Sequence, residues 1–312
     1  MRASSVFAAL VAASLSPLAF AGQFSRVVSF GDSLSDAGNV SANTFGFVPG
    51  FGYFNGRFSN GPIWTDLIAQ SNGLPTPLPA LAPIPQPGAS NFGVGGARVN
   101  QTALFFGQPI PSFASTVTGY VATGPAIPAD ALVTIWIGSN DYLSGSLPAS
   151  PTPLVDSIRN AVVALAQFKG ARQFVVLGLP PIGLTPDIRS QGPVVSGVVN
   201  AAVQSFNAQL SQIPGQVAAA VPGANVTYFD TFGLFESIAQ NPAGTGLSNF
   251  TDRAFTSPTV VPNPDSYLYW DGVHPTRVGH SLLARAVITA IPEPSLLALG
   301  AVLIPLLARA RR

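Results

Sequence analysis

Apolar residues along the chain follow two patterns that alternate with each other. Short apolar or β-branched runs are typical of buried strands, and they occupy residues 24–30, 131–137, 174–179 and 226–229. Longer segments repeat apolar residues at helical spacing, and they occupy residues 60–69, 154–168, 194–213 and 277–291. The alternation predicts a parallel sheet covered by helices on both faces.

No internal repeat or interdomain linker interrupts this alternation. Residues 74–90 are rich in proline and predict an extended surface connection. Ligands of parallel sheets bind at the carboxyl ends of the strands. Polar residues directly after the apolar runs are therefore the first candidates for chemistry.

The N-terminal residues 1–21 have the parts of a secretory signal peptide. Arg2 supplies the positive charge, an apolar run follows, and Ala19-Phe20-Ala21 matches a small-x-small cleavage site. A buried helix or an uncut anchor are the alternatives, although the run is short for a membrane span. We expect cleavage after Ala21 and export of the protein.

The C-terminal residues 292–312 combine Pro-Glu-Pro, an apolar run and closing arginines. An apolar segment followed by basic residues is a stop-transfer pattern. The order resembles the bacterial PEP-CTERM sorting signal, a transient anchor that an exosortase-type processing enzyme cleaves. The resemblance implies a Gram-negative host, a transient inner-membrane anchor, and a mature protein that is secreted or held at the cell surface. A terminal helix of the fold is the alternative, and the folded domain is expected over residues 22–291.

The composition narrows the possible chemistry. Charged residues make up 9% of the chain and the net charge is +1, without a basic stripe, so no nucleic-acid partner is expected. Cysteine is absent and only His274 and His280 are present, which excludes thiol chemistry and His-rich zinc sites. No metal or cofactor is implied. An imidazole base must be one of these two histidines.

Three polar clusters contain the residues that a serine hydrolase needs. Ser33 follows the first apolar run, and Asn140 follows the run at 131–137. Asp271 precedes His274 by three residues, so the two side chains can meet within one turn. A serine hydroxyl is a weak nucleophile unless a base removes its proton, and a third group must orient that base. Ser33, His274 and Asp271 can fill these roles.

Four ordered blocks resemble those of GDSL-type esterases/lipases in the SGNH hydrolase superfamily. They are FGDSLSDAGN at 30–39, NFGVGGA at 91–97, IGSND at 137–141 and DGVHPT at 271–276. The resemblance extends over nearly the whole mature chain. It implies an α/β fold, a three-layer α/β/α sandwich with a mainly parallel, flavodoxin-like sheet. No G-x-S-x-G motif occurs, which argues against an ordinary α/β-hydrolase.

The resemblance also implies a role for each motif position. Ser33 becomes the nucleophile, His274 the general base and Asp271 the carboxylate that orients it. The oxyanion hole is expected to combine the Ser33 amide, the Gly96 amide and the Asn140 side chain. Gly95 is the alternative to Gly96, because family members shift by one residue here.

Five further polar residues are expected to have structural roles. Asp32 and Asp36 should accept hydrogen bonds from loop amides, and Asp141 should be structural. Arg57 is interpreted as a structural loop residue. His280 is interpreted as an ordinary residue at the surface or its boundary.

These observations predict an exported serine esterase or lipase that hydrolyses carboxylic esters, including lipids, through an acyl-enzyme. A non-catalytic surface or biofilm-matrix protein on a hydrolase fold is the alternative from another class. Acyl transfer to another alcohol and deacetylation of polysaccharide are alternatives within the enzyme class. The aromatic-rich segment 45–54 either lines an acyl pocket or packs within the fold.

Overall fold

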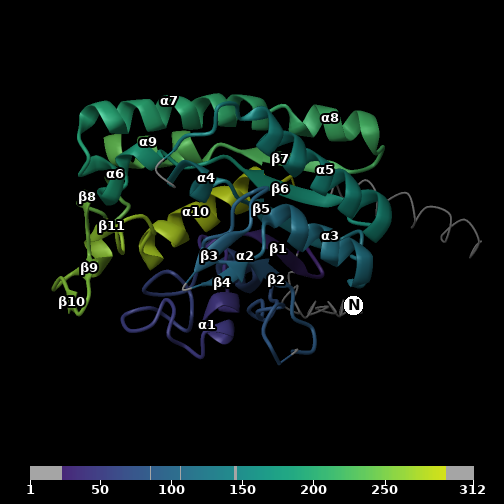
Figure 1. The fold of residues 1–312 in the computed structure, drawn as a ribbon, viewed down its shortest axis with the longest axis horizontal. Helices are drawn as coiled ribbons and strands as arrows, with labels where there is room; N and C mark the ends of the chain where they lie inside the picture. The colour runs from purple at the N-terminus through teal and green to yellow at the C-terminus, as the bar shows by residue number, and fades with distance from the viewer. Residues whose placement is uncertain (1–22, 85, 106, 144–145, 293–312) are drawn as a thin grey trace, which may run out of the picture.

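The computed structural model describes residues 23–84, 86–105, 107–143 and 146–292 (Figure 1). The expected signal peptide and the PEP-CTERM-like tail beyond Pro292 lie outside the described residues. At the centre is a five-stranded sheet in the order β2-β1-β5-β6-β7, in which every neighbouring pair is parallel. Its strands are β1 (Val27–Gly31), β2 (Asn91–Gly93), β5 (Leu132–Trp136), β6 (Gln173–Leu177) and β7 (Asn225–Phe229). This is the flavodoxin-like order, and it confirms the predicted fold class.

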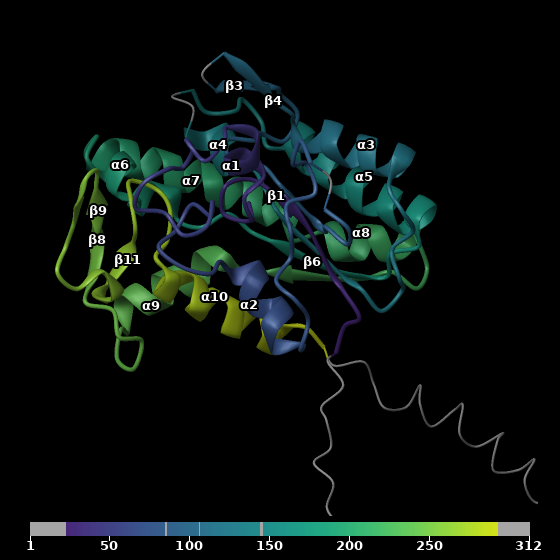
Figure 2. The same cartoon turned by 90° about the horizontal axis from the view of Figure 1, so that it is seen from below.

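Helices cover both faces of the sheet (Figure 2). The four on one face are α3 (Phe113–Thr123), α5 (Thr152–Lys169), α7 (Pro193–Leu210) and α8 (Ile213–Ala220). The other face carries α2 (Trp64–Ser71) and α10 (Arg277–Ala290), and α9 (Thr231–Gln240) packs beside α10. Successive strand residues point to opposite faces: Val133 packs with the first set of helices, and Leu132 packs with the second.

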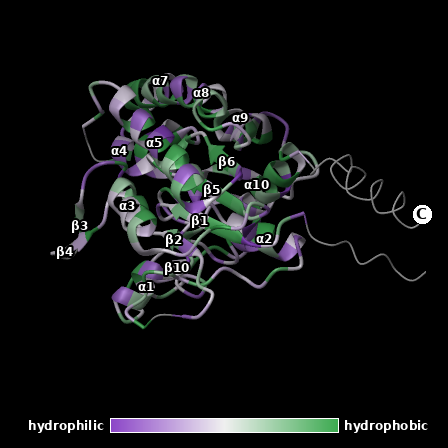
Figure 3. Cartoon of the chain, turned by 90° about the vertical axis from the view of Figure 1, so that its right-hand side faces the viewer, coloured by the Kyte–Doolittle hydropathy of each residue, from purple (hydrophilic) through white to green (hydrophobic). Residues whose placement is uncertain are grey.

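The strands are hydrophobic on both sides because both sides are covered. All residues of β1 and β5 are buried. Figure 3 shows the strands in hydrophobic green, between helices that carry both colours. The short apolar runs in the sequence therefore identified β1, β5, β6 and β7, but not the three-residue strand β2 at the edge of the sheet.

Shorter elements surround the edges of this sandwich. The short helices are α1 (Asn39–Asn43), α4 (Ser139–Leu143), α6 (Pro186–Arg189), and the 3-10 turns at Ile182–Leu184 and Pro264–Ser266. Three two-stranded ladders pair β3 (Ala103–Phe105) with β4 (Gln108–Ile110), β8 (Asn249–Arg253) with β11 (Tyr267–Tyr269), and β9 (Phe255–Thr256) with β10 (Thr259–Val260). The proline-rich segment 74–90 forms no helix or strand in its described part.

The structure refines the predicted helix boundaries. The helix expected over 194–213 is two helices, α7 and α8, because Ser211 and Gln212 form a turn between them. The expected helix 60–69 begins later, at Trp64, since Asp66 bonds back to the Ile63 amide there. No helix in the described ranges is long and apolar enough to span a membrane.

Candidate active site

The carboxyl edge of the sheet brings together three loops from distant parts of the sequence. Ser33 follows β1, the Gly95-Gly96 pair follows β2, and Asn140 follows β5. Strand β1 lies between β2 and β5, so the strands that follow it in sequence are added on both of its sides. Such a switch point is where open parallel sheets bind ligands.

The turn that carries Ser33 is held by its own backbone and by Asp32. The Asp32 carboxylate accepts the Leu34 N–H at 3.0 Å, and the Asp32 carbonyl accepts the Ser35 N–H at 3.0 Å. Gly31 is required before the turn, because a Cβ there would lie 2.4 Å from the Trp136 carbonyl oxygen. The sharp turn thus depends on a close approach between β1 and β5.

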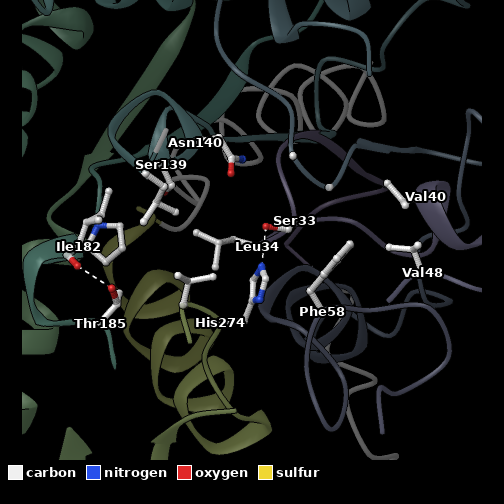
Figure 4. A pocket seen from close by; sticks show the side chains of 15 residues that line it. Ser33, Leu34, Val40, Val48, Phe58, Ser139, Asn140, Ile182, Thr185 and His274 are labelled. Atoms are coloured by element: carbon white, nitrogen blue, oxygen red, sulfur yellow. Dashed lines mark hydrogen bonds between the residues drawn. The ribbon is translucent and has the colours of Figure 1, made fainter. Parts of the chain in front are cut away.

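A continuous chain of hydrogen bonds joins Ser33, His274 and Asp271. The Ser33 Oγ lies 2.8 Å from His274 Nε2 (Figure 4). His274 Nδ1 lies 2.7 Å from Asp271 Oδ2. A hydroxyl, an imidazole and a carboxylate in this order can activate a serine as a nucleophile. The structure brings together these three predicted residues although 241 positions separate Ser33 from His274.

The loop that carries His274 is shaped by the same carboxylate. Asp271 Oδ1 accepts the backbone N–H groups of Val273 at 2.9 Å and His274 at 2.8 Å. Helix α10 begins directly after this loop, with Thr276 as its N-cap. The Asp271 side chain therefore fixes both the backbone and the imidazole ring of His274.

Tyr53 is a member of this network that the sequence did not indicate. Its hydroxyl donates to Asp271 Oδ2 at 2.7 Å. Its ring makes edge contacts with Phe58, Phe255 and Trp270. Only its place in an aromatic-rich segment marked Tyr53, because no motif relates it to a residue 218 positions away.

The electrostatics of the pair keep Asp271 ionised. Burial disfavours its charged form, but the charge and hydrogen bond of His274, with the Val273 N–H and the Tyr53 hydroxyl, outweigh this and lower the pKa of Asp271. Burial likewise disfavours the imidazolium, but the Asp271 carboxylate outweighs it and raises the pKa of His274 above its ordinary value. The imidazole is thus a stronger base than a free histidine side chain.

Three other carboxyl groups near Ser33 have raised rather than lowered pKa values. Burial raises the pKa of Asp32 to about 7, and that of Asp36 and Asp141 to about 6. Asp36 accepts backbone N–H groups from Gly38, Asn39, Val40 and Gly95. Asp141 accepts the Val99 N–H at 3.0 Å. All three hold loops in place, as the sequence predicted.

Ser33, Gly96 and Asn140 line the same pocket and carry candidate hydrogen-bond donors. Among the described residues, the N–H groups of Ser33 and Gly96 donate to no protein acceptor. The Gly95 N–H, in contrast, donates to the Asp36 carboxylate at 2.9 Å. The Asn140 amide uses one N–H on the Ala97 carbonyl at 3.0 Å and lines the pocket (Figure 4). Free donors of this kind can stabilise an oxyanion.

The pocket itself is a largely apolar cavity of about 200 Å³. Its apolar lining comes from Leu34, Val40, Val48, Phe58, Leu143, Pro180, Ile182 and Val273. Figure 4 shows Val40, Val48 and Phe58 on one side of Ser33, and Ile182 and Thr185 on the other. Within the described ranges, no three His, Asp or Glu side chains gather in a way that could hold a metal ion.

The prediction for His280 was wrong. It is fully buried, and its Nδ1 accepts the Trp64 N–H at 3.4 Å. Position 280 shares the buried face of α10 with Leu283, Ala284 and Val287, a helical spacing that was readable in the sequence. Burial, followed by the influence of His274, lowers the pKa of His280 to about 3.

The prediction for Arg57 is confirmed. Its guanidinium binds both carboxylate oxygens of Asp66, at 3.0 and 3.1 Å, and the pair is buried. Asp66 also accepts the Ile63 N–H and so fixes the start of α2. Arg57 therefore joins the loop after α1 to this helix.

Comparisons with known proteins place the sequence in a family. The family model "GDSL-like Lipase/Acylhydrolase" matches residues 27–287. A GDSL esterase/lipase of Arabidopsis thaliana is 28% identical over 310 residues, covering 86% of this chain and 89% of its own. A phosphatidylcholine-sterol acyltransferase of Aeromonas hydrophila is 26% identical over 320 residues, covering 86% and 90%. Among solved structures, a lipolytic G-D-S-L family protein of Veillonella parvula has a TM-score of 0.46 at 15% identity, covering 85% of this chain and 96% of that chain.

Proposed function

Because this chain belongs to the GDSL-like lipase/acylhydrolase family and is a carboxylic ester hydrolase, we propose that it is an exported serine esterase or lipase that works through an acyl-enzyme. The observation that carries this proposal is the hydrogen-bonded series Ser33–His274–Asp271 beside free N–H donors. The apolar lining of the pocket suits an ester with a hydrocarbon acyl chain.

In the first half of the reaction, Ser33 Oγ attacks the carbonyl carbon of the ester while His274 Nε2 takes the hydroxyl proton. Asp271 stabilises the imidazolium that forms and keeps its ring oriented. The tetrahedral intermediate collapses as His274 gives the proton to the leaving alcohol. The acyl group then remains on Ser33 as an ester.

The oxyanion of each tetrahedral intermediate is held by the Ser33 amide, the Gly96 amide and the Asn140 side chain. Gly96 is favoured over Gly95 because the Gly95 N–H is already bonded to Asp36. Gly96 has a φ of 81° and a Cβ there would lie 2.8 Å from Ile110, so a glycine suits this position. Donors fixed by the ends of strands need little reorganisation during the reaction.

In the second half, His274 takes a proton from water, which attacks the acyl-enzyme. The second intermediate collapses, the proton returns to Ser33, and the carboxylic acid leaves. If an alcohol replaces the water, the same steps transfer the acyl group. The similarity to a phosphatidylcholine-sterol acyltransferase gives this second candidate a specific basis.

Export rests on the sequence of residues 1–21 and 292–312. We propose that the signal peptide is removed after Ala21. The tail would hold the enzyme at the inner membrane until an exosortase-type enzyme cleaves it.

The decisive experiment is to label the protein with a fluorophosphonate probe and to assay soluble p-nitrophenyl esters. Wild-type protein should be labelled once and should hydrolyse the esters. Ser33→Ala should lose labelling and lose turnover by about 10⁶-fold, the scale of a lost serine nucleophile. A Ser157→Ala variant on α5 is the matched control and should keep both. Labelling of purified Ser33→Ala at the wild-type rate would refute the assignment.

A further inference from the structure

The loop after α1 exposes three phenylalanine rings. Phe45, Phe47 and Phe51 are 90%, 82% and 74% exposed. Removing a phenylalanine side chain from water is strongly favourable, so soluble proteins rarely leave several exposed within seven residues. A patch of this kind marks an interaction site.

The loop is held in turns rather than left open. The Gly46 N–H donates to the Ser41 carbonyl at 2.8 Å, and the Phe47 N–H donates to the Thr44 carbonyl at 2.9 Å. Phe45 has a φ of 52°, in the left-handed region that residues with a side chain seldom adopt. The fold therefore accepts backbone strain at a residue whose ring is almost wholly in solvent.

The exposed rings adjoin the pocket that contains Ser33. Val48, in the same loop, lines that pocket together with Val40 from α1 (Figure 4). The Phe51 ring lies 6.5 Å from Phe255, which stacks on Trp270 beside the His274 loop. The loop is drawn in purple and blue at the lower margin of Figure 1.

The charge of the loop indicates what kind of surface it meets. Residues 37–56 contain no Lys, Arg, Asp or Glu. Segments that bind anionic lipids use lysine and arginine beside their apolar residues. An uncharged aromatic patch next to an apolar ester pocket instead fits a neutral or zwitterionic lipid surface.

We propose that Phe45, Phe47 and Phe51 insert into the surface of aggregated lipid ester and bring the pocket to substrate held there. This inference rests on the proposed ester hydrolysis at Ser33, because the aggregated ester is the substrate. The docked surface is a lipid–water interface, and the enzyme acts on molecules within it.

The test measures binding of the full mature chain to phosphatidylcholine vesicles, in a Ser33→Ala background that leaves the lipid intact. Phe45→Asn, Phe47→Ser and Phe51→Ser are combined; asparagine tolerates the left-handed backbone at position 45. Vesicle binding should weaken by about 100-fold, roughly fivefold for each partly buried ring. Phe168→Ser is the matched control, since Phe168 is 70% exposed at the far end of α5. That end leads into the amino end of β6, opposite the pocket.

A spectroscopic signature tests insertion directly. Trp64, Trp136 and Trp270 are all buried, so a Phe47→Trp variant adds an exposed indole. Its emission should shift to shorter wavelength when vesicles are added, while wild-type emission stays constant. No shift in Phe47→Trp would contradict insertion.

Activity separates this inference from the proposed function. With Ser33 retained, the triple variant should hydrolyse soluble p-nitrophenyl acetate at a rate within about twofold of wild type. Its rate on emulsified ester should fall by at least about tenfold. If wild type fails on the soluble ester, the proposed function fails. If the triple variant binds vesicles as wild type does, only the surface inference fails. A wild-type dimer that the triple variant dissociates, without vesicle binding, would assign the patch to a second copy and overturn the inference.

Discussion

The site has two halves: the turns that follow strands of the central sheet, and the loop 270–276. Carboxyl groups have opposite pKa shifts in these two halves. At the carboxyl edge of the sheet, no cation among the described residues makes a hydrogen bond to Asp32, and burial raises its pKa to about 7. In the loop 270–276, Asp271 is also shielded from solvent, but its bond to His274 helps to lower its pKa. An aspartate therefore holds a turn in place in one half, as Asp32 does, and keeps a permanent negative charge in the other, as Asp271 does. A facing imidazole makes the difference.

The two halves are also held by different means. Ser33, Gly96 and Asn140 follow parallel strands, so the backbone ladder of the sheet positions them. The His274 loop follows no strand of the central sheet. It depends on side chains, above all Asp271 and the aromatic contacts around Tyr53. Substitutions in the turns after the strands should alter kcat or the free energy of unfolding. Substitutions in the loop 270–276 should also alter the pH dependence of kcat/KM.

Among the changes that distinguish the two halves of the site, the largest expected effect comes from removing the charge of Asp271. Asp271→Asn should lower kcat by about 10⁴-fold, since the imidazole loses the group that orients it and stabilises its charged form. Asp271 raises the pKa of His274, so its loss should lower that pKa. The rising limb of kcat/KM should therefore move to lower pH even as the maximum falls. An unchanged limb in a soluble-ester assay would contradict this coupling.

The next effect concerns Asp32 and the pH dependence of the free energy of unfolding. In the folded state Asp32 has a pKa of about 7, against about 4 in an unfolded chain. The folded state therefore holds the proton more tightly, and stability from this group is full below about pH 4 and lost as pH rises through about 7. By linkage the loss reaches about 4 kcal/mol. Asp32→Asn should reduce the fall in unfolding free energy between these pH values, measured by urea titration.

The control for this measurement is Asp156→Asn, an exposed carboxyl on α5. It separates the effect of removing a buried carboxyl from the effect of removing any one carboxyl. Asp36 and Asp141 keep part of the slope in Asp32→Asn, because burial raises their pKa values too. An equal slope in Asp32→Asn and wild type would show that Asp32 is ionised without penalty.

A smaller effect is expected for Asn140, the side-chain donor that follows β5. Asn140→Ala should lower kcat by about 10²- to 10³-fold, the cost of one oxyanion donor. KM should change little, because the donor acts on charge that develops during the reaction. The limb of the pH profile should stay in place, unlike that of Asp271→Asn. Steady-state kinetics on a soluble ester check both points, and a change confined to KM would make Asn140 a binding residue.

Strands β1, β5 and β6 were predictable from sequence because nearly all their residues are buried. Strand β7 is mostly half-buried but keeps a short β-rich run, and the three-residue strand β2 was not predicted. A continuous apolar run such as 131–137 has few other structural explanations. Helix α3 escaped prediction, since glycine and small polar residues dilute its apolar spacing. Helix α9 was also missed, although Phe232, Phe235 and Ile238 recur at helical spacing and were readable in the sequence. The ladder β8–β11 joins segments that are distant in sequence, so no local pattern records it. The hairpin β9–β10 is local, but its two-residue strands are too short to leave a pattern.

The site was predictable only as far as its motifs reach. The blocks named Ser33, Asn140 and His274, and the structure brings them to one pocket. The choice between Gly95 and Gly96 needed the hydrogen bond that Asp36 makes to Gly95. Tyr53 reaches Asp271 through a loop whose path depends on the whole fold.

The smallest expected effect concerns Tyr53, which links the aromatic loop to the charged half. Its hydroxyl and the His274 imidazole share Asp271 Oδ2. Burial and the Asp271 carboxylate raise the pKa of Tyr53, so the hydroxyl stays a donor over the working pH range. Tyr53→Phe keeps the ring contacts but removes this bond. The freed carboxylate oxygen then attracts the imidazolium more strongly, and the pKa of His274 should rise.

The limb of kcat/KM should therefore move to higher pH in Tyr53→Phe, opposite to its movement in Asp271→Asn. We expect kcat to fall by about three- to tenfold, the scale of one typical intramolecular hydrogen bond. Tyr120→Phe, on the buried face of α3, is the matched control and should move neither quantity. Since a purely structural role for Tyr53 would lower stability without moving the limb, the direction of the shift decides whether Tyr53 positions the charge of Asp271.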